Sequence, residues 1–527
     1  MEFFDALVFL GRRRGGPDYQ AADLDGLRRM LDRYGIARAV VHSVAATLLE
    51  VAYGNERVFD AAEQEPRLVP CPAVVPDDAE NAGGPEAYVD GLLARGARCV
   101  AVHENAHQVS LAPEVMGGLL AALEARRVPT AVMDNADALR VGQALRAYPG
   151  LPVLLHAPRY RTRNVVPALR AYPNLYVSVV PGFCPYRGLE TLRERIGVDR
   201  VLYGSGFPLH EPGAPMSQVL LSALTDAEAA QVAGGNLSRL VEGVRVSKSA
   251  RSKRAISSAP WSPARGLGAF AGPVLRREPP DVDGITDMHA HYGRWYAYPM
   301  YGGEADDLVA EMDRAGVARM VVAHEACMGP ESRYGNDVVL DAARRYPGRI
   351  LGYACCSAAS EETGVDEVRR ALDAGLVGVK LHTGAGHPYT HERYRPVWEL
   401  VNARGLPMLL HTWADLDKYE HLFEAYPRAQ ILLGHAGVKD PDPYVACARR
   451  HANVWLDITY SAAPYGVVET FVREVGAQRV LFGSDAPWMS VQQQLGRVLF
   501  ADVSDADKRT ILVDNPTRVL EGGPDRV

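Results

Sequence analysis

The sequence has few cysteines, and no two of them form a CxxC pair. Seven are scattered along the 527 residues. This odd number lacks the spacing of a disulfide framework or of a zinc-binding module. Disulfide-stabilised folds belong mainly to oxidising compartments. The cysteine pattern therefore favours a reduced, cytoplasmic protein.

Long hydrophobic runs and an excess of positive charge are also missing. No apolar run approaches the roughly 18 residues of a membrane span. Residues 3–10 are interrupted by Asp5 and followed, not preceded, by arginines, which is the reverse of a signal peptide. The formal net charge of −7 argues against a general binder of nucleic acid or anionic membranes. No GxGxxG follows a strand-like run, so a dinucleotide site is disfavoured. We expect neither nucleic-acid nor membrane partners.

Lysine is scarce, because the chain carries six lysines against 51 arginines. One of the six, Lys380, lies inside the apolar run of residues 376–381. Lysine and arginine are not interchangeable, and an amine has chemistry that a guanidinium lacks. Lys380 is therefore a candidate site residue, with a salt-bridged structural lysine as the alternative.

The chain contains an internal repeat. Residues 32–41 match residues 313–322, residues 53–55 match 334–336, and residues 201–205 match 480–484, always about 280 positions apart. A steady offset of this size indicates two copies of one domain, and the length also suits two domains better than one core. We place these domains at residues 1–245 and 281–527. Residues 246–280, rich in Ser, Pro and Arg, are interpreted as a flexible linker, with a basic nucleic-acid arm as the weaker alternative.

Each copy alternates short apolar runs with longer amphipathic stretches. In the second copy such runs occupy residues 319–323, 376–381, 407–411, 430–434, 453–458 and 479–483. Runs of this kind between helical patterns are typical of buried parallel strands in βα units. About eight units per copy favour a closed (β/α)8 barrel over an open sheet. The predicted fold class is α/β, with two tandem barrels joined by the linker.

Polar residues that can bind a metal stand at strand ends of the second copy. His289 and His291 are two apart, so both point to one side of a strand. His411 and His435 close two later apolar runs, and Asp485 follows the last one. Such positions converge at the C-terminal end of a barrel. Imidazoles with a carboxylate suit one divalent ion, and we expect Zn²⁺.

The order of these residues resembles the amidohydrolase superfamily, with HxH on strand one, a lysine on strand four, histidines on strands five and six, and Asp on strand eight. The Gly-Ser-Asp-Ala-Pro segment around Asp485 resembles its amidohydrolase-related branch, which contains lactonases, amide hydrolases and decarboxylases. The resemblance implies the following metal ligands: His289, His291, His411 and Asp485. It gives His435 a substrate-facing role and makes Asp485 a general base. It implies an unmodified Lys380 beside the substrate, the alternative being a carbamylated lysine that bridges two ions.

Aromatic loops suggest the substrate pocket. The predicted substrate-binding residues are Arg294, Trp295, His382, Trp413 and Trp488, with Glu325 and Arg333 as weaker candidates. An aromatic rim with one arginine suggests a cyclic substrate that bears a carboxylate. Ordinary loop packing explains the same aromatics.

The first copy has lost most of these residues. In register, His289, His291, Lys380, His411 and Asp485 correspond to Leu7, Phe9, Ala101, Met133 and Gly206, and only His435 keeps a counterpart, His156. We predict that this copy is a barrel without metal chemistry that pairs with the active copy and contributes Arg12–Arg14 or a cap. A new site built from His42, His103, Glu104, Asp134 and His156 is the alternative.

The favoured function is a metal-dependent hydrolase that cleaves an amide or lactone of a small molecule with metal-activated water. The alternative is a non-oxidative decarboxylase that uses the same site. A non-catalytic binding module is the third hypothesis. The sequence leaves the substrate and the state of further oligomerisation open.

Overall fold

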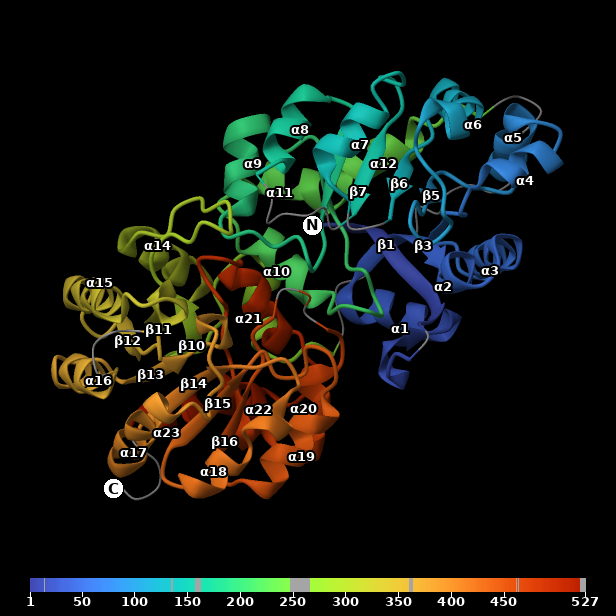
Figure 1. Ribbon diagram of the computed structural model, residues 1–527. Helices are drawn as coiled ribbons and strands as arrows, with labels where there is room; N and C mark the ends of the chain where they lie inside the picture. The colour runs from blue at the N-terminus through green and yellow to red at the C-terminus, as the bar shows by residue number, and fades with distance from the viewer. Residues whose placement is uncertain are drawn as a thin grey trace. The chain divides into compact units, whose positions relative to one another are not determined.

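The chain consists of two compact α/β units. The computed structural model describes residues 1–13, 15–133, 136–156, 163–246, 266–359, 364–460, 462 and 464–521. One unit is Met1–Cys184 with Gly188–Leu267, and the other is Pro185–Arg187 with Gly268–Val527. In each unit the helices run along the outside of a parallel barrel (Figure 1). The predicted fold class of two (β/α)8 barrels is thereby confirmed. Arg14, Asp134 and residues 247–265 of the predicted linker lie outside the described residues.

The first barrel closes through two bridges between its strand ladders. Its parallel strands are β1 (Phe3–Arg12), β3 (Ile36–Ser43), β4 (Leu68–Pro70), β5 (Val100–Val102), β6 (Thr130–Val132), β7 (Val153–His156), β8 (Leu175–Val179) and β9 (Val201–Tyr203). The short β2 (Ala21–Ala22) pairs antiparallel with β1. Parallel bridges join Ala73 to Ala101 and Val8 to Phe207. These bridges connect β4 to β5 and β9 back to β1, so the sheet has no free edge among its parallel strands.

Helices follow the strands of the first barrel. They are α1 (Leu24–Tyr34), α2 (Val44–Leu48), α3 (Val51–Gln64), α4 (Pro76–Asn81), α5 (Pro85–Ala94), α6 (Pro113–Ala125), α7 (Ala138–Ala144), α8 (Val165–Ala171), α9 (Gly188–Ile196), α10 (Gly213–Leu220), α11 (Asp226–Ala230) and α12 (Asn236–Glu242), with the short η1 (Asp18–Gln20) and η2 (Gln231–Gly235). Local sequence sets their ends: α1 begins after Asp23, whose carboxylate accepts from the Gly26 amide, and ends at Gly35 with φ of 62°.

The second barrel is built from strands in sequential order. They are β10 (Thr286–His291), β11 (Arg319–Ala323), β12 (Ile350–Cys355), β13 (Gly378–Leu381), β14 (Pro407–His411), β15 (Gln430–Gly434), β16 (Val454–Asp457) and β17 (Val480–Leu481). Hydrogen bonds close the ring: the Met288 amide donates to the Phe482 carbonyl at 2.9 Å, and the Asp485 amide donates to the His289 carbonyl at 2.8 Å. Apolar side chains such as Met288, Leu409 and Leu432 fill the interior.

The helices of the second unit are α13 (Ala271–Leu275), α14 (Ala305–Ala315), α15 (Ser332–Arg345), α16 (Gly364–Asp373), α17 (Arg395–Arg404), α18 (His421–Ala425), α19 (Asp442–Arg450), α20 (Val467–Val475), α21 (Val491–Leu499), α22 (Asp505–Arg509) and α23 (Asn515–Leu520). Short turns of helix are η3 (Glu325–Met328), η4 (Thr383–Ala385), η5 (Glu392–Tyr394), η6 (Leu416–Lys418), η7 (Ala477–Arg479) and η8 (Thr510–Asp514). No helix among the described residues is long and apolar enough to cross a membrane. All seven cysteines are buried, and none of them forms a disulfide among the described residues.

The last part of the predicted linker, residues 268–280, contains a helix, α13, and is not a flexible linker. Ala271 and Val274, three positions apart, are fully buried, and the Ala269 amide donates to the Asp505 carboxylate at 2.6 Å. The helix is only five residues long, so its apolar residues do not form a recognisable helical pattern within the Ser/Pro/Arg-rich sequence. Residues 268–280 therefore belong to the second compact unit and are not part of a featureless linker.

The two barrels keep the same internal hydrogen bonds. Asn236 donates to the carbonyls of Val198 and Val201 at 2.7 and 2.8 Å. Asn515 donates in the same way to two carbonyls just before and within β17, both at 2.8 Å. Because a buried carbonyl without a partner costs about 1–3 kcal/mol, these side chains were retained with the fold.

Candidate active site

The C-terminal ends of the strands in the second barrel bring three predicted metal ligands together. His289 and His291 stand at the end of β10, and Asp485 follows β17. The Asp485 Oδ1 atom lies 3.4 Å from His289 Nε2 and 3.2 Å from His291 Nε2. All three side chains are buried. Strand ends separated by almost 200 residues therefore meet, as barrel topology requires.

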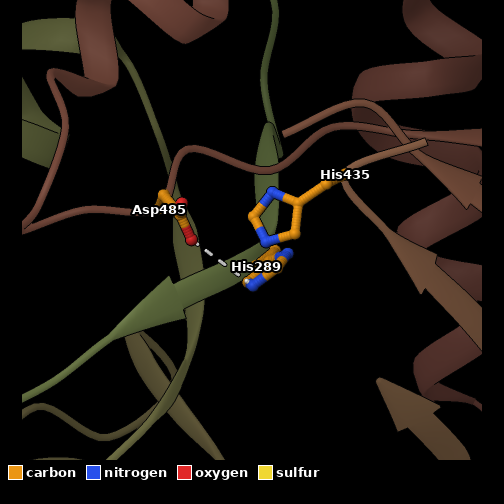
Figure 2. A group of neighbouring side chains, drawn as sticks. All are labelled: His289, His435 and Asp485. Carbon is orange, nitrogen blue, oxygen red and sulfur yellow. Dashed lines mark ion pairs between the residues drawn. The ribbon is translucent and has the colours of Figure 1, made fainter. Parts of the chain in front are cut away.

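His435 joins this group. His289, His435 and Asp485 each offer a ligand atom, and these atoms lie within 4.8 Å of one another (Figure 2). His411, which the sequence assigned to the metal, lies beside His435, with His411 Nδ1 3.0 Å from His435 Nε2. The geometry thus draws His435 into the closest ligand set, where the sequence interpretation gave it only a substrate-facing role.

The spacing of the donor atoms fits a small cation. Nitrogen and oxygen ligands of a tetrahedral zinc ion sit at about 2.0–2.2 Å from it, hence roughly 3.3–3.5 Å from one another. The separations of 3.2 and 3.4 Å around Asp485 Oδ1 are close to this value. The residues present therefore suit one divalent ion between β10 and the segment after β17.

Two neighbours orient the imidazoles. His289 Nδ1 lies 2.5 Å from Asp457 Oδ2 and donates to it, and His435 Nδ1 donates to the Thr459 carbonyl at 2.9 Å. With Nδ1 protonated, each neutral ring keeps the lone pair of Nε2 for the centre. The sequence interpretation missed Asp457. Its signal was present, because Asp457 ends an apolar strand, β16, as the chosen residues end theirs.

Glu325 lies on the other side of His291. Its Oε1 atom is 2.8 Å from His291 Nδ1, but without hydrogen-bond geometry, so neither Glu325 oxygen nor Nδ1 has a hydrogen-bond partner among the described residues. Burial raises the pKa of Glu325. Burial lowers the pKa of His291, but the charges of Glu325 and Asp485 outweigh it and raise that pKa to about 9. Such unsatisfied buried polar atoms are uncommon in folded proteins and are typical of a functional site.

Lys380 points into the same cluster. It is fully buried on β13, and its Nζ lies 3.0 Å from His289 Nε2. Burial lowers the pKa of the Lys380 amine. Among the described residues no carboxylate lies within ion-pair distance of it, so the alternative of a salt-bridged structural lysine does not describe this side chain.

The charge states of most of these groups suit metal binding; His291, whose pKa is raised, would have to release a proton when a metal binds. Burial alone raises the pKa of Asp485, but the imidazole of His435 and the hydrogen bond from His291 outweigh it and hold that pKa below its usual range. Burial lowers the pKa values of His289, His411 and His435. An ionised carboxylate and neutral imidazoles are the forms in which these groups bind metal ions.

Aromatic rings form a wall beside the cluster. The Trp488 ring stacks on His291 with centroids 3.7 Å apart and planes at 15°, and Trp295 lies 4.8 Å from Trp488. Trp413 stacks on His435 at 5.5 Å and 8°. The three tryptophans predicted as substrate contacts therefore lie around the histidines, on both sides of the ligand group.

Of the two remaining predicted substrate residues, His382 lies at the cluster and Arg294 does not. His382 is nearly buried, and its ring centroid lies 4.0 Å from that of His411. Arg294 is not brought to the cluster: its side chain is 70% exposed and pairs with Glu304 at 3.6 Å. The direction of Arg294 depends on the loop after β10, which its sequence does not specify. The prediction that Arg294 contacts substrate therefore has no support in this geometry.

The fold and the site define a barrel of the amidohydrolase type, and comparison with known proteins agrees. The family model described as Amidohydrolase matches residues 2–241 and 286–522. Since these segments cover most of the chain, the protein belongs to the amidohydrolase family.

The chain is also similar to individual characterised proteins. It is 24% identical over 249 residues to a gamma-resorcylate decarboxylase of Rhizobium radiobacter, covering 36% of this chain and 76% of the relative. It is 23% identical over 275 residues to the enzyme of that name from Polaromonas sp. (strain JS666 / ATCC BAA-500), covering 39% and 84%. Among solved structures, it resembles 2,6-dihydroxybenzoate decarboxylase in complex with 2,6-dihydroxybenzoate, with 18% identity, a TM-score of 0.38, and coverage of 46% of this chain and 100% of that one.

Proposed function

We propose that the second barrel is a metal-dependent, non-oxidative decarboxylase of a small aromatic carboxylic acid. The observation that carries this proposal is the set of decarboxylase relatives, combined with tryptophans that stack on His291 and His435. Hydrolysis of an amide or lactone, the reaction favoured from the sequence, needs the same ligands and is the second candidate. The relatives support decarboxylation over hydrolysis.

The metal would be held by residues from several strand ends: His289, His291, His435 and Asp485. When bound, such an ion supplies a positive centre that attracts substrate oxygens and stabilises developing negative charge. The donor types suit Zn²⁺. The structure of a dihydroxybenzoic acid decarboxylase from Polaromonas sp. JS666 contains manganese, so Mn²⁺ is the other candidate here.

The aromatic wall argues for a planar substrate. Tyr298 lies parallel to Trp488 at 5.5 Å and 3°, and Trp488 in turn stacks on His291. Trp413 stacks on His435, on the other side of the ligand group. Aromatic rings bind one another by offset stacking, which contributes about 0.5–1.5 kcal/mol beyond burial. These rings give the surroundings of the ligand group an aromatic lining, which suits a planar single-ring acid.

His411 is placed to handle the proton. Because His435 Nδ1 donates to the Thr459 carbonyl, one proton lies between His435 Nε2 and His411 Nδ1, 3.0 Å apart. Decarboxylation breaks the bond between the ring carbon and the carboxylate, CO₂ leaves, and the ring carbon takes up a proton. We assign delivery of that proton to His411, which carries it on Nδ1, because the Nε2 atom of His435 is needed for the metal. Lys380, beside His289, stabilises negative charge on the substrate.

The test is product analysis with 2,6-dihydroxybenzoate and related hydroxybenzoates in ¹⁸O-labelled water. We expect release of CO₂ and a ring product without ¹⁸O. His291→Ala and Asp485→Ala lose about 100-fold or more of this activity, since even loss of a residue that only orients a metal ligand costs about 10–100-fold. The control is His421→Ala, an exposed histidine outside the cluster. If the protein instead converts an amide or lactone into an acid that carries ¹⁸O and releases no CO₂ from the hydroxybenzoates, the hydrolase is assigned; activity unchanged in both variants would overturn the site.

A further inference from the structure

The first barrel keeps a cavity at the strand ends where the second barrel has its ligands. The cavity has a volume of about 220 Å³. Among its lining residues are the counterparts of the second-barrel ligand positions, namely Leu7, Phe9, Met133, His156 and Gly206. Among the described residues of this barrel, no three potential metal ligands come together. A cavity is therefore present at these strand ends, where metal ligands are not.

Buried imidazoles give the cavity its hydrogen-bonding groups. His103 and His156 both line it and are 4% and 3% exposed. His156 Nδ1 lies 2.8 Å from the Ser178 hydroxyl, which leaves Nε2 for another partner. His42 Nδ1 donates to the Cys71 carbonyl, and its Nε2 lies 3.0 Å from both His103 Nε2 and the Thr47 hydroxyl, which is itself 3.2 Å from His103 Nε2. A hydrogen-bond chain thus holds His103 in place.

These imidazoles are uncharged at neutral pH. Burial lowers the pKa of His156 to about 3 and, with the charges of neighbouring histidines, lowers that of His103 to about 2. The cavity interior therefore offers neutral polar atoms among apolar walls such as Phe9 and Val180.

One guanidinium lines the same cavity. The exposed Arg13 makes no ion pair with any described residue, whereas its neighbour Arg12 pairs with Asp18 at 2.6 Å. No carboxylate is found among the described lining residues. Arginine binds carboxylates through two parallel hydrogen bonds. The charge of the cavity is therefore complementary to an anion.

We propose that the first barrel binds a small planar carboxylate, a single-ring aromatic acid, without converting it. Pockets for drug-sized ligands span roughly 300–1,000 Å³, so 220 Å³ suits a smaller molecule. The apolar walls cover the ring, Arg13 binds the carboxylate, and His156 accepts from or donates to a ring substituent. Because Leu7, Phe9 and Gly206 stand where the second barrel has ligands, the bound acid meets no metal.

The experiment uses the full chain with His291→Ala and Asp485→Ala, which removes the second-barrel centre. Salicylate is the fluorescent probe, and its stoichiometry is measured by equilibrium dialysis. We expect one salicylate per chain and weaker binding of benzyl alcohol, which has the ring but no carboxylate. Because this background has no active centre, the result does not depend on whether the second barrel is a decarboxylase.

Three further variants locate the bound salicylate. Arg13→Gln lowers the affinity by about tenfold, the usual effect of losing a charge-assisted hydrogen bond. Val180→Phe fills the cavity and abolishes binding, with thermal unfolding measured to verify that this variant folds. Arg12→Gln, next in sequence but paired with Asp18, is the matched control and leaves binding unchanged. Absence of salicylate binding, or binding that neither Arg13→Gln nor Val180→Phe weakens, would overturn the proposal.

Discussion

At the scale of single residues, the second barrel depends on side chains that do not touch the ligand centre themselves. Asp457 fixes the ring of His289 through Nδ1, and Thr459 in turn donates to Asp457 Oδ1 at 2.7 Å. Thr459 also positions His435 through its carbonyl. One short segment at the end of β16 therefore sets the tautomers of two of the three clustered groups.

We predict that Asp457→Asn weakens metal binding by about 10–100-fold, because residues that orient a metal-binding histidine typically contribute that much. The measurement is competition with a chelator of known affinity. Asp417→Asn, which changes an exposed aspartate in the same barrel, is the control. Equal affinities in the two variants would show that Asp457 only fills space in the core.

At the scale of elements, one aspartate joins the first and last strands of each barrel. In the first barrel Asp5 Oδ1 accepts from the amides of Leu7 at 3.0 Å and Ser205 at 2.8 Å. Asp287 does the same in the second barrel, where the Ser484 amide lies 3.1 Å from its Oδ1. In both side chains the second carboxylate oxygen is buried without a hydrogen-bond partner. The closure of the barrel therefore holds a carboxyl group in a place that disfavours its charge.

The pKa of Asp5 gives a pH-dependent prediction. Burial raises this pKa from 3.8 to about 7, although bonds from Ser205 and Leu7 oppose the shift. A group with a raised pKa in the folded state contributes stability at low pH and loses it as pH rises towards that value. Each pKa unit corresponds to about 1.4 kcal/mol, so unfolding of the first barrel becomes easier by a few kcal/mol between about pH 4 and pH 8.

Asp5→Asn removes the titrating group while keeping an oxygen that can accept both amides. Its first-barrel unfolding temperature should therefore change less between pH 5 and pH 8 than that of the wild type, as followed by calorimetry. Asp60→Asn, at an exposed aspartate of the same barrel, should keep the wild-type pH dependence. If Asp5→Asn also kept it, another group would be responsible.

Neighbouring atoms leave no room for a side chain at Gly483, which lies where the last strand of the second barrel meets the first. A Cβ at Gly483 would lie 2.1 Å from Thr459 Oγ1 and 2.6 Å from His289 Cβ. The strand predicted at residues 479–483 accordingly ends earlier, at Leu481, and the chain then turns to deliver Asp485. Glycine is required here because a larger residue would displace the ring of a ligand histidine.

At the scale of the whole molecule, the chain holds two compact units of one fold with different residues at their strand ends. Each has its own closed sheet and its own apolar interior. Ligands that bind only the folded state stabilise the unit that holds them, by about 2.7 kcal/mol at a concentration of 100 times Kd. Metal should therefore affect the two units unequally.

We predict that addition of Zn²⁺ or Mn²⁺ to metal-free protein raises the unfolding temperature of one transition and leaves the other unchanged. Differential scanning calorimetry separates the transitions, and the Asp5→Asn variant identifies which of them belongs to the first barrel. With His291→Ala and Asp485→Ala, the shift on metal addition should vanish. An equal shift of both transitions would mean that the first barrel also binds metal or unfolds together with the second.

The sequence by itself determined the duplication, the barrel class and the strand-end positions of His289, His291 and Asp485, because strand periodicity and a constant 280-residue offset are local, one-dimensional signals. It placed the aromatic residues near the site for the same reason. Only the tertiary structure showed Asp457 and Glu325 against the histidines, turned Arg294 away to Glu304, and left a cavity in the first barrel. These depend on loop direction and on packing between residues far apart in sequence, which no local pattern encodes.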